Sequence, residues 1–573
     1  MLLKYSIDEN SKLLEKWIKK LNDENVIERI WKKDHTVWSN EPTEISNRLG
    51  WLDSPSVTKK SFEEIYDFVD DVKSAGFTNA LLMGMGGSSL APEVFRMTFG
   101  VKDGYLNLAV LDSTDPQYIM DYVKKFNPEK TLYIISTKSG GTVETFSFMK
   151  FFYNYACHVL GKEKAGKHFI AITDPGSGLQ KVAEDLNFRK IFLNDPDIGG
   201  RFSALSLFGI VPAALIGVDI AKVIASAEDE IILAKKSGKE ITKNIPAVVG
   251  LLMGIYAAQG KDKLTFIIPP ELKHFGCWVE QLIAESTGKI GKGILPVDLE
   301  SLESPEFYSN DRLFVYIKIK DSASFDDKVV KLKSAGHTFI ELELELDPTE
   351  LNGIGELSQI GSQFFLWEFA TAIAGWLMQI QPYDQPNVES AKIVARQMMK
   401  EYQENGKLTE LLSVINEEGI KIFGDVKTKS IKNVLASFLE DCEGGKNYVS
   451  IQAYLTPDEK NTEMLQKLRT SIQKKYMVAT TLGFGPRFLH STGQLHKGDA
   501  GNGYFIQFIA ATQDDIPIPD NAGSEKSSIT FGVLIKAQAL GDRQALIDNH
   551  RKVITIDIGK NDITSCESLL NNF

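Results

Sequence analysis

The chain has 573 residues, a length that predicts three to four domain-sized units at about 150 residues each. Hydrophobic residues make up 43% of the chain and charged residues 24%, which excludes wholesale disorder. The formal net charge is −12, and no basic stretch is concentrated enough to favour a nucleic acid or an anionic membrane surface as a partner. Small anions are not excluded, because a few local donors can bind a phosphate inside an acidic protein.

Metal-binding and targeting signals are weak. The cysteines Cys157, Cys277, Cys442 and Cys566 lie far apart, and no CxxC pair indicates a zinc site or a disulfide framework. The start of the chain is charged from Lys4 onward and lacks the apolar core of a signal peptide. The longest apolar stretches fall short of the roughly 20 residues that span a bilayer. We therefore expect a cytoplasmic protein that binds no metal and is not embedded in a membrane.

Residues 1–45 have the amphipathic spacing of helices, and from about residue 60 helices and strands alternate. This alternation predicts an α/β fold with a parallel sheet covered by helices on both faces. The helices expected in the first block are Phe62–Ala75, Leu90–Phe99, Pro116–Phe126, Val143–Leu160 and Gly178–Leu186. The strands expected there are Asn79–Met83, Leu106–Leu111, Thr131–Ser136 and His168–Thr173.

Two further blocks share one order of elements. The second has strands at Lys263–Ile268, Arg312–Lys318 and His337–Glu343, then helices at Ile354–Ile380 and Asn387–Glu404. The third has a strand at Asn447–Leu455, a helix at Asn461–Lys475, a strand at Gly503–Ala510 and a helix–strand pair at Arg543–Asp557. The third block is therefore predicted to repeat the second. The predicted division is an N-terminal helical segment (1–45), a first domain (46–200), a second domain (201–404), a helical linker (405–444) and a C-terminal α/β domain (445–573).

Two turns between a strand and a helix carry residues suited to binding phosphate. In LLMGMGGSSLAPE (Leu81–Glu93), glycines let backbone amides approach an anion at a helix start. It is neither a dinucleotide fingerprint, because Ser89 replaces the third glycine, nor a P-loop, because no GK[ST] follows. The second turn, YIISTKSGGTVET (Tyr133–Thr145), adds hydroxyls and Lys138. A tight turn or ordinary N-capping would explain one of them, but two in one block favour phosphate binding.

Three segments place polar side chains near helix ends. GGRFSALS puts Arg201 at the head of an apolar helix, and VEQLIAESTGK puts Gln281 and Glu285 on one helical face. PYDQPNVESAK breaks and restarts a helix, with Lys392 about one and a half turns into it. Taken singly, each of these side chains is as well explained by a surface ion pair or a solvated helix face.

The segment GPRFLHSTGQLHKGDAGNGYF contains His490 and His496, two of the eight histidines in the chain. Histidines in a loop between the elements of a packed domain are better functional candidates than histidines on an apolar helix face. Structural hydrogen bonding is an equally good explanation of the pair.

Taken together and in order, GMGGSSLAP, STKSGGTVET, GGRFSALS, VEQLIAESTGK and PYDQPNVESAK resemble the signature segments of glucose-6-phosphate isomerases. These belong to the sugar isomerase (SIS) superfamily, and the resemblance covers about residues 45–400. The chain looks most like the isomerase half of bacterial transaldolase–glucose-6-phosphate isomerase fusion proteins. Only 46 residues precede NRLGWLDSP, so we expect no transaldolase activity. The resemblance implies two SIS-type parallel-sheet αβα sandwich domains plus a third, smaller SIS-like α/β C-terminal domain.

The resemblance also implies the roles of individual residues and requires neither a metal nor a cofactor. The groups that hold the sugar phosphate would be Ser88, Thr137, Lys138, Ser139 and Thr142, and Glu144, also expected to bind substrate, matches the glutamate that ends the loop. Gly141 stands where the family has a hydroxyl residue. Arg201 matches the arginine that stabilises the enediolate, and Glu285 matches the base that moves a proton between neighbouring carbons. The remaining matches, two glutamines and a lysine, are Gln281, Gln385 and Lys392.

One departure from the family concerns the histidine that opens the sugar ring, which follows the base, often within an LHSxGQ segment. The corresponding stretch here, residues 294–311, contains no histidine, whereas LHSTGQ occurs at residues 489–494 in the third block. We hypothesise that the third block donates His490, with His496 as the reserve candidate. In the family this histidine comes from a neighbouring subunit, so whether His490 acts in its own chain or across a homodimer stays open.

The resemblance predicts a glucose-6-phosphate isomerase of glycolysis and gluconeogenesis. It would interconvert glucose 6-phosphate and fructose 6-phosphate by ring opening and proton transfer through a cis-enediol. One alternative is a dual phosphoglucose/phosphomannose isomerase, and another is a non-catalytic SIS-type sugar-phosphate sensor. A sensor could keep the phosphate site without Glu285, Arg201 and Lys392, and all three are present.

Overall fold

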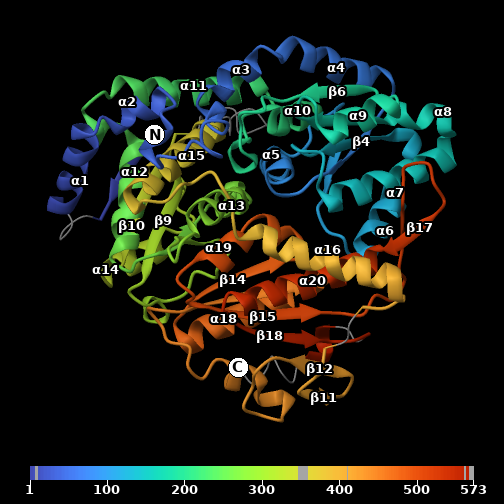
Figure 1. The fold of residues 1–573 in the computed structure, drawn as a ribbon. Coiled ribbons are helices and arrows are strands. Elements are labelled where there is room, and N and C mark those ends of the chain that lie inside the picture. The colour runs from blue at the N-terminus through green and yellow to red at the C-terminus, as the bar shows by residue number, and fades with distance from the viewer. Residues whose placement is uncertain (7–10, 346–358, 409–410, 561–562, 567–573) are drawn as a thin grey trace.

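The computed structural model describes residues 1–6, 11–345, 359–408, 411–560 and 563–566. In these residues the chain forms three mainly parallel sheets flanked by helices, together with one short two-stranded sheet (Figure 1). The α/β class predicted from the sequence is confirmed. The domain boundaries stay a prediction.

The first sheet has the strand order β3-β2-β4-β5-β6 and is parallel throughout. Its strands are β2 (Asn79–Met83), β3 (Asn107–Leu111), β4 (Thr131–Ser136), β5 (Phe169–Thr173) and β6 (Lys190–Leu193). Its main helices are α4 (Phe62–Ser74), α5 (Leu90–Phe99), α6 (Pro116–Lys125), α7 (Val143–Leu160) and α9 (Gly178–Asp185). Successive strand residues such as Leu81 and Leu82 pack into two different hydrophobic cores, so both faces of this sheet are buried.

The second sheet has the order β1-β10-β9-β7-β8. Its parallel strands are β7 (Lys263–Ile267), β8 (Leu295–Val297), β9 (Arg312–Ile319) and β10 (Thr338–Leu344). Its helices are α10 (Leu207–Leu215), α11 (Ile220–Lys236), α12 (Ile245–Ala258), α13 (Phe275–Thr287), α14 (Asp326–Ser334) and α15 (Ile360–Met378). Helix α15 is the one predicted at Ile354–Ile380, of which residues 354–358 lie outside the described residues.

The prediction that residues 1–45 are helical is wrong at the start of the chain. Helices α1 (Ser11–Asp23) and α2 (Val26–Trp31) form as expected, but β1 (Leu2–Tyr5) pairs antiparallel with β10. A four-residue strand has too short a pattern to be recognised, and here its pairing partner decides the conformation.

The third sheet has the order β11-β12-β18-β15-β13-β14. Its parallel strands are β13 (Tyr448–Tyr454), β14 (Ala479–Phe484), β15 (Gly503–Ile509) and β18 (Lys552–Asp557), and its helices are α18 (Glu459–Tyr476), α19 (Gly493–Gly498) and α20 (Phe531–Asp548). The order β18-β15-β13-β14 reproduces β10-β9-β7-β8 of the second sheet. Each series also carries an antiparallel strand on the same edge, β12 on β18 and β1 on β10. The predicted repeat is confirmed.

The prediction of a helical linker at residues 405–444 is wrong. This segment forms the hairpin of β11 (Ile415–Glu417) and β12 (Ile420–Phe423), and its α-helix, α17 (Val434–Phe438), is short. Glu418 and Gly419 between the strands have φ of 52° and 80°, the geometry of a two-residue hairpin turn. Ile420 and Ile422 then face the core on alternate positions, a period-2 pattern that four residues barely reveal.

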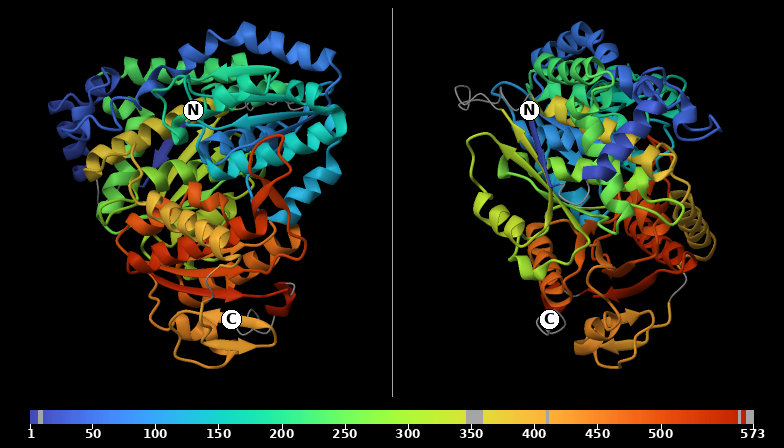
Figure 2. Two further views of the ribbon diagram at one scale, coloured as in Figure 1. Left: turned by 45° about the vertical axis from the view of Figure 1, so that its right-hand side comes forward. Right: turned by 90° about the vertical axis from the view of Figure 1, so that its left-hand side faces the viewer.

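The third sheet and its helices lie against both other units (Figures 1 and 2). Helix α16 (Val388–Asn405), predicted to close the second block, packs on α20, where a Cβ on Gly541 would come within 3.0 Å of the Ala391 carbonyl oxygen. The hairpin of β16 (Pro517–Pro519) and β17 (Ser527–Thr530) extends to α7 of the first unit (Figure 1). Among the described residues, every helix is too short or too polar to cross a membrane.

Candidate active site

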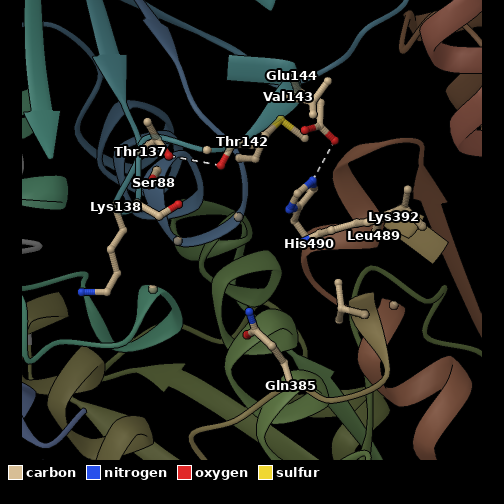
Figure 3. A pocket seen from close by; sticks show the side chains of 18 of the residues that line it. Ser88, Thr137, Lys138, Thr142, Val143, Glu144, Gln385, Lys392, Leu489 and His490 are labelled. Atoms are coloured by element: carbon tan, nitrogen blue, oxygen red, sulfur yellow. Dashed lines mark hydrogen bonds and ion pairs between the residues drawn. The ribbon is translucent and has the colours of Figure 1, made fainter. Parts of the chain in front are cut away.

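A cavity of about 440 Å³ lies where the three units meet (Figure 3). Its walls come from the two turns of the first unit, from α13 and the Gln385 loop, from α16, and from the segment around His490. Every residue predicted for the site lines it: Ser88, Thr137, Lys138, Ser139, Thr142, Glu144, Arg201, Gln281, Glu285, Gln385, Lys392 and His490.

The glycine-rich turn after β2 allows the walls of the cavity to approach one another closely. Gly86 has φ of +55°, and a Cβ there would lie 2.7 Å from the Gln281 amide nitrogen. A Cβ on Gly87 would lie only 1.9 Å from the Gly200 carbonyl oxygen, in the turn that carries Arg201. The glycines are therefore required for packing this turn against Gln281 and the turn that carries Arg201, because any side chain would push these segments apart.

A second turn places hydroxyls and helix amides at the same wall. The Thr137 and Thr142 hydroxyl oxygens lie 3.1 Å apart, and Thr142 directly precedes α7, a helix of 18 residues. The Ser136 hydroxyl donates to the Ser88 carbonyl oxygen at 3.0 Å, which ties this turn to the glycine-rich one. The first amides of a helix have no acceptor within it and favour negative charge, so this corner suits a phosphate.

Lys138 belongs to the cavity lining, but its ammonium group turns away from the threonine hydroxyls (Figure 3). It pairs with the Asp174 carboxylate and donates to the Pro196 carbonyl oxygen at 2.7 Å. A phosphate at this corner would therefore be held chiefly by hydroxyls and backbone amides.

Glu285 and Arg201 form a buried pair at the opposite wall. The Arg201 Nη1 atom lies 3.3 Å from Glu285 Oε1, and both side chains are less than a tenth exposed. The guanidinium also donates to the Ser286 hydroxyl at 2.9 Å, to Gln385 Oε1 at 2.9 Å, and to the carbonyl oxygens of Pro382 and Asp384. Such a fully bonded cation is fixed in place, so it needs no reorganisation when negative charge develops beside it.

Gln281 links the carboxylate to the histidine segment. Its amide nitrogen donates to Glu285 Oε2 at 3.2 Å and to the His490 carbonyl oxygen at 2.7 Å. Gln281 lines the cavity, and its buried Oε1 has no hydrogen-bond partner among the described residues. A buried acceptor without a donor is costly, so a ligand hydroxyl in this cavity would satisfy it.

His490 reaches the cavity from its own chain, at the end of the short helix Arg487–His490 that follows β14. Its Nε2 atom lies 2.9 Å from Glu144 Oε1, and the two side chains point toward each other (Figure 3). Burial raises the pKa of the Glu144 carboxyl, but the charge and hydrogen bond of His490, helped by Lys392, outweigh it and lower that pKa below its usual range. Glu144, predicted as a substrate-binding residue, is thus the hydrogen-bond partner of the histidine.

His496, the reserve candidate, lies away from the cavity. It is buried in the third unit, near Ser450 and Gln452, and burial holds its pKa well below 6.5. Its segment nevertheless helps to hold the site, because Gln494 bonds both the Gly288 carbonyl oxygen and Asn387 at the start of α16.

Sequence reasoning missed several polar side chains of the cavity, among them Gln538, Lys497 and Arg48. Arg48 lies in NRLGWLDSP and Lys497 in the segment with the two histidines, but neither was chosen as a site residue. Gln538 sits on a helix with no distinctive pattern. Only the strand order of the third unit, which brings α20 over the cavity, could have indicated that Gln538 lines it.

The fold and the cavity define the class of protein. Three mainly parallel α/β units converge on a phosphate-suited corner that faces a buried carboxylate–arginine pair. Residues 53–298 match the family model described as phosphoglucose isomerase.

The chain is similar in sequence to several glucose-6-phosphate isomerases and similar in fold to a solved one. A glucose-6-phosphate isomerase of Rubrobacter xylanophilus is 29% identical over 58% of this chain and 85% of its own. A probable glucose-6-phosphate isomerase of Methanococcus maripaludis is 29% identical over 62% of this chain and 85% of its own. A glucose-6-phosphate isomerase structure from Chlamydia trachomatis has a TM-score of 0.56 at 17% identity and covers 70% of this chain and 89% of its own, a likeness of fold.

Proposed function

We propose that this protein is a glucose-6-phosphate isomerase that interconverts glucose 6-phosphate and fructose 6-phosphate. The observation that carries the proposal is the convergence, in one cavity, of a phosphate-suited corner, the Glu285–Arg201 pair and the Glu144–His490 pair. The relatives named as glucose-6-phosphate isomerases supply the choice of substrate.

Binding would begin at the phosphate. The Ser88 turn and the Thr137–Thr142 turn would take the phosphate of the sugar, with the amides at the start of α7. The phosphate does not react, so the free energy of binding it serves to place the reacting carbons against Glu285.

Isomerisation would then require one base and one fixed cation. Glu285 would remove the proton from C2 of the open-chain aldose and return it to C1, passing through a cis-enediol. The Arg201 guanidinium, held by five contacts with other residues, would stabilise the negative charge that develops on the enediol oxygens. Gln281 Oε1 and Gln385 would orient the sugar hydroxyls.

Ring opening would be the task of His490. With Nε2 held by Glu144, the other ring nitrogen can exchange a proton with the sugar ring, while Glu144 stabilises the imidazolium that forms. Lys392 lines the same side of the cavity and would supply a second positive charge there. All of these groups come from a single chain, so a homodimer is not needed to complete the site; the cytoplasmic location stays a prediction.

The non-catalytic sensor is not favoured, because a binding protein has no need of a buried glutamate held beside an arginine and an unpaired amide oxygen. A dual phosphoglucose/phosphomannose isomerase would use the same residues, and no contact in the cavity favours it.

A coupled assay tests the proposal. Purified protein is added to fructose 6-phosphate with glucose-6-phosphate dehydrogenase and NADP, and formation of NADPH is followed. We expect turnover by the wild-type protein, and absence of turnover at saturating substrate would refute the function. Mannose 6-phosphate, assayed in parallel with a matching reporter, measures the second activity.

A further inference from the structure

Helix α20 of the third unit places one glutamine in contact with the Glu144–His490 pair. The Gln538 amide nitrogen donates to Glu144 Oε1 at 2.7 Å, the oxygen that also faces His490 Nε2 at 2.9 Å. At its other end, Gln538 Oε1 accepts from the Thr114 hydroxyl at 2.8 Å. Both Gln538 and Thr114 are buried, and Gln538 lines the cavity.

The chemistry of these groups fixes which way the amide points. An ionised carboxylate can only accept hydrogen bonds, so the amide nitrogen, and not the amide oxygen, must face Glu144. The amide oxygen then faces Thr114, whose hydroxyl can donate to it. The carboxylate thus selects the orientation of the amide, and the Thr114 hydroxyl holds the amide in that orientation.

The pair of contacts joins parts of the chain that are far apart in sequence. Thr114 follows β3 and Glu144 begins α7 in the first unit, whereas Gln538 and His490 both belong to the third unit. The charged and titratable groups that act on Glu144 or feel its charge are His490, Lys392 on α16 and Tyr454 on β13. Gln538 is the uncharged member of this set, and it bonds the carboxylate directly.

We propose that Gln538, oriented by Thr114, is a positioning residue that holds the Glu144 carboxylate in place against His490 for ring opening. The inference rests on the proposed isomerase function and assigns to the third unit a second contribution beyond the histidine itself. Gln538 stabilises the ionised carboxylate with a charge-assisted hydrogen bond, and it stops the Glu144 side chain from rotating away from the imidazole.

The test compares ring-closed with open-chain substrate in the variant Gln538→Leu. We expect kcat/KM for glucose 6-phosphate to fall about tenfold, the loss typical of one hydrogen bond to a charged group, with less than a twofold change for an open-chain analogue that cannot cyclise. Because the lost bond favoured the ionised carboxylate, the acid limb of the pH–rate profile for glucose 6-phosphate should move to higher pH.

Two further sets of variants separate positioning from loss of structure. Gln507 is a buried glutamine of the same unit with the same bonding pattern, since its Oε1 accepts from Thr555 and its Nε2 donates to the Ala539 carbonyl oxygen. Gln507 does not line the cavity, so Gln507→Leu should destabilise the protein without changing the substrate ratio or the acid limb. Thr114→Val should reproduce part of the Gln538→Leu effect, whereas Thr114→Ser, which keeps the hydroxyl, should behave like the wild type.

Equal losses on both substrates, or an unmoved acid limb in Gln538→Leu, would overturn the proposal while leaving the isomerase function intact. If the wild-type protein were not an isomerase, the NMR titration of its ¹³C-labelled histidines would still decide the contact. The His490 ring signals are assigned by their absence from the spectrum of His490→Asn, and they should follow the ionisation of Glu144. This ionisation should occur at higher pH in Gln538→Leu than in wild type. Identical titrations would overturn the proposal.

Discussion

The second and third sheets share one topology but carry different parts of the site. In the second, α13 between β7 and β8 bears Glu285, and the connection from β8 to β9 contains no histidine. In the third, α18 between β13 and β14 lines no part of the cavity in its described residues, and the connection from β14 to β15 bears His490. The base and the histidine therefore occupy different elements of the same repeated plan.

A second difference between the two units lies in the helix that precedes the last parallel strand. In the second unit this helix, α14, has nine residues, whereas its counterpart α20 in the third has 18 and reaches the cavity with Gln538. The comparison teaches that a repeated sheet can place side chains from different connections in one cavity. The sheet of the third unit repeats the strand order of the second, and its connections bring His490 and Gln538 to the cavity.

The largest effect is expected at the base of the second unit. Glu285→Gln keeps the size and hydrogen bonding of the side chain but removes the proton acceptor, so kcat should fall about 10³-fold or more with both ring-closed and open-chain substrate. The coupled assay measures it. Glu271→Gln, an exposed glutamate just before α13, is the matched control and should retain full activity.

The histidine of the third unit should give a smaller and selective effect. His490→Ala removes the group that exchanges a proton with the sugar ring, so kcat/KM for glucose 6-phosphate should fall about 10²-fold. An open-chain analogue bypasses that step and should lose less than about tenfold. Equal losses on the two substrates would show that His490 does not act in ring opening.

The contact between the second and third units should make the free energy of unfolding depend on pH. Burial, with Asp298 nearby, raises the pKa of Glu280 on α13 to about 8, and Arg469 and Arg487 of the third unit face it. The folded protein therefore holds a proton that the unfolded chain releases near its ordinary pKa of 4.5, so stability should fall as pH rises from about 5 to 8.

Between pH 5 and 8, the free energy of unfolding of Glu280→Gln should fall less than that of the wild type, by at least about 1 kcal/mol. Urea unfolding at each pH measures it. An unchanged dependence would mean that Glu280 is not protonated in the folded protein.

The smallest effect on rate is expected at the second histidine of the LHSTGQ region. His496 lies outside the cavity, so His496→Gln should lower the free energy of unfolding by about 1–2 kcal/mol while kcat/KM changes less than about threefold. A selective loss with ring-closed substrate would instead assign ring opening to His496.

The sequence predicted the long, buried elements well and the short edge elements poorly. Strands β2 and β4 and helices α5 and α7 have the predicted bounds, because their apolar runs are long and bounded by turn residues. Strands β6 and β8, of four and three residues, were missed, and so was β14, at the edge of its sheet. Such strands owe their conformation to a neighbour that the local sequence does not reveal.

The residues of the site also divide into those that a local pattern predicts and those that only tertiary packing reveals. Ser88, Arg201, Glu285 and their companions were found because they lie in motifs, and each motif is local in sequence. Thr114 and Gln538 bond to each other across 424 residues, and no local pattern marks either of them. The partnership of Glu144 with His490 also follows only from the packing of the third unit on the first.

The central claim is that one chain completes the site, with the base from the second unit and the histidine from the third. Co-production of Glu285→Gln and His490→Ala chains, carrying different affinity tags so that any mixed assembly can be isolated, tests it directly. If each site is built within one chain, the mixture turns over glucose 6-phosphate no faster than the sum of the two variants. Recovery of up to about half of wild-type activity in the isolated mixed dimer would contradict this account, because it requires His490 to reach the site of a second chain.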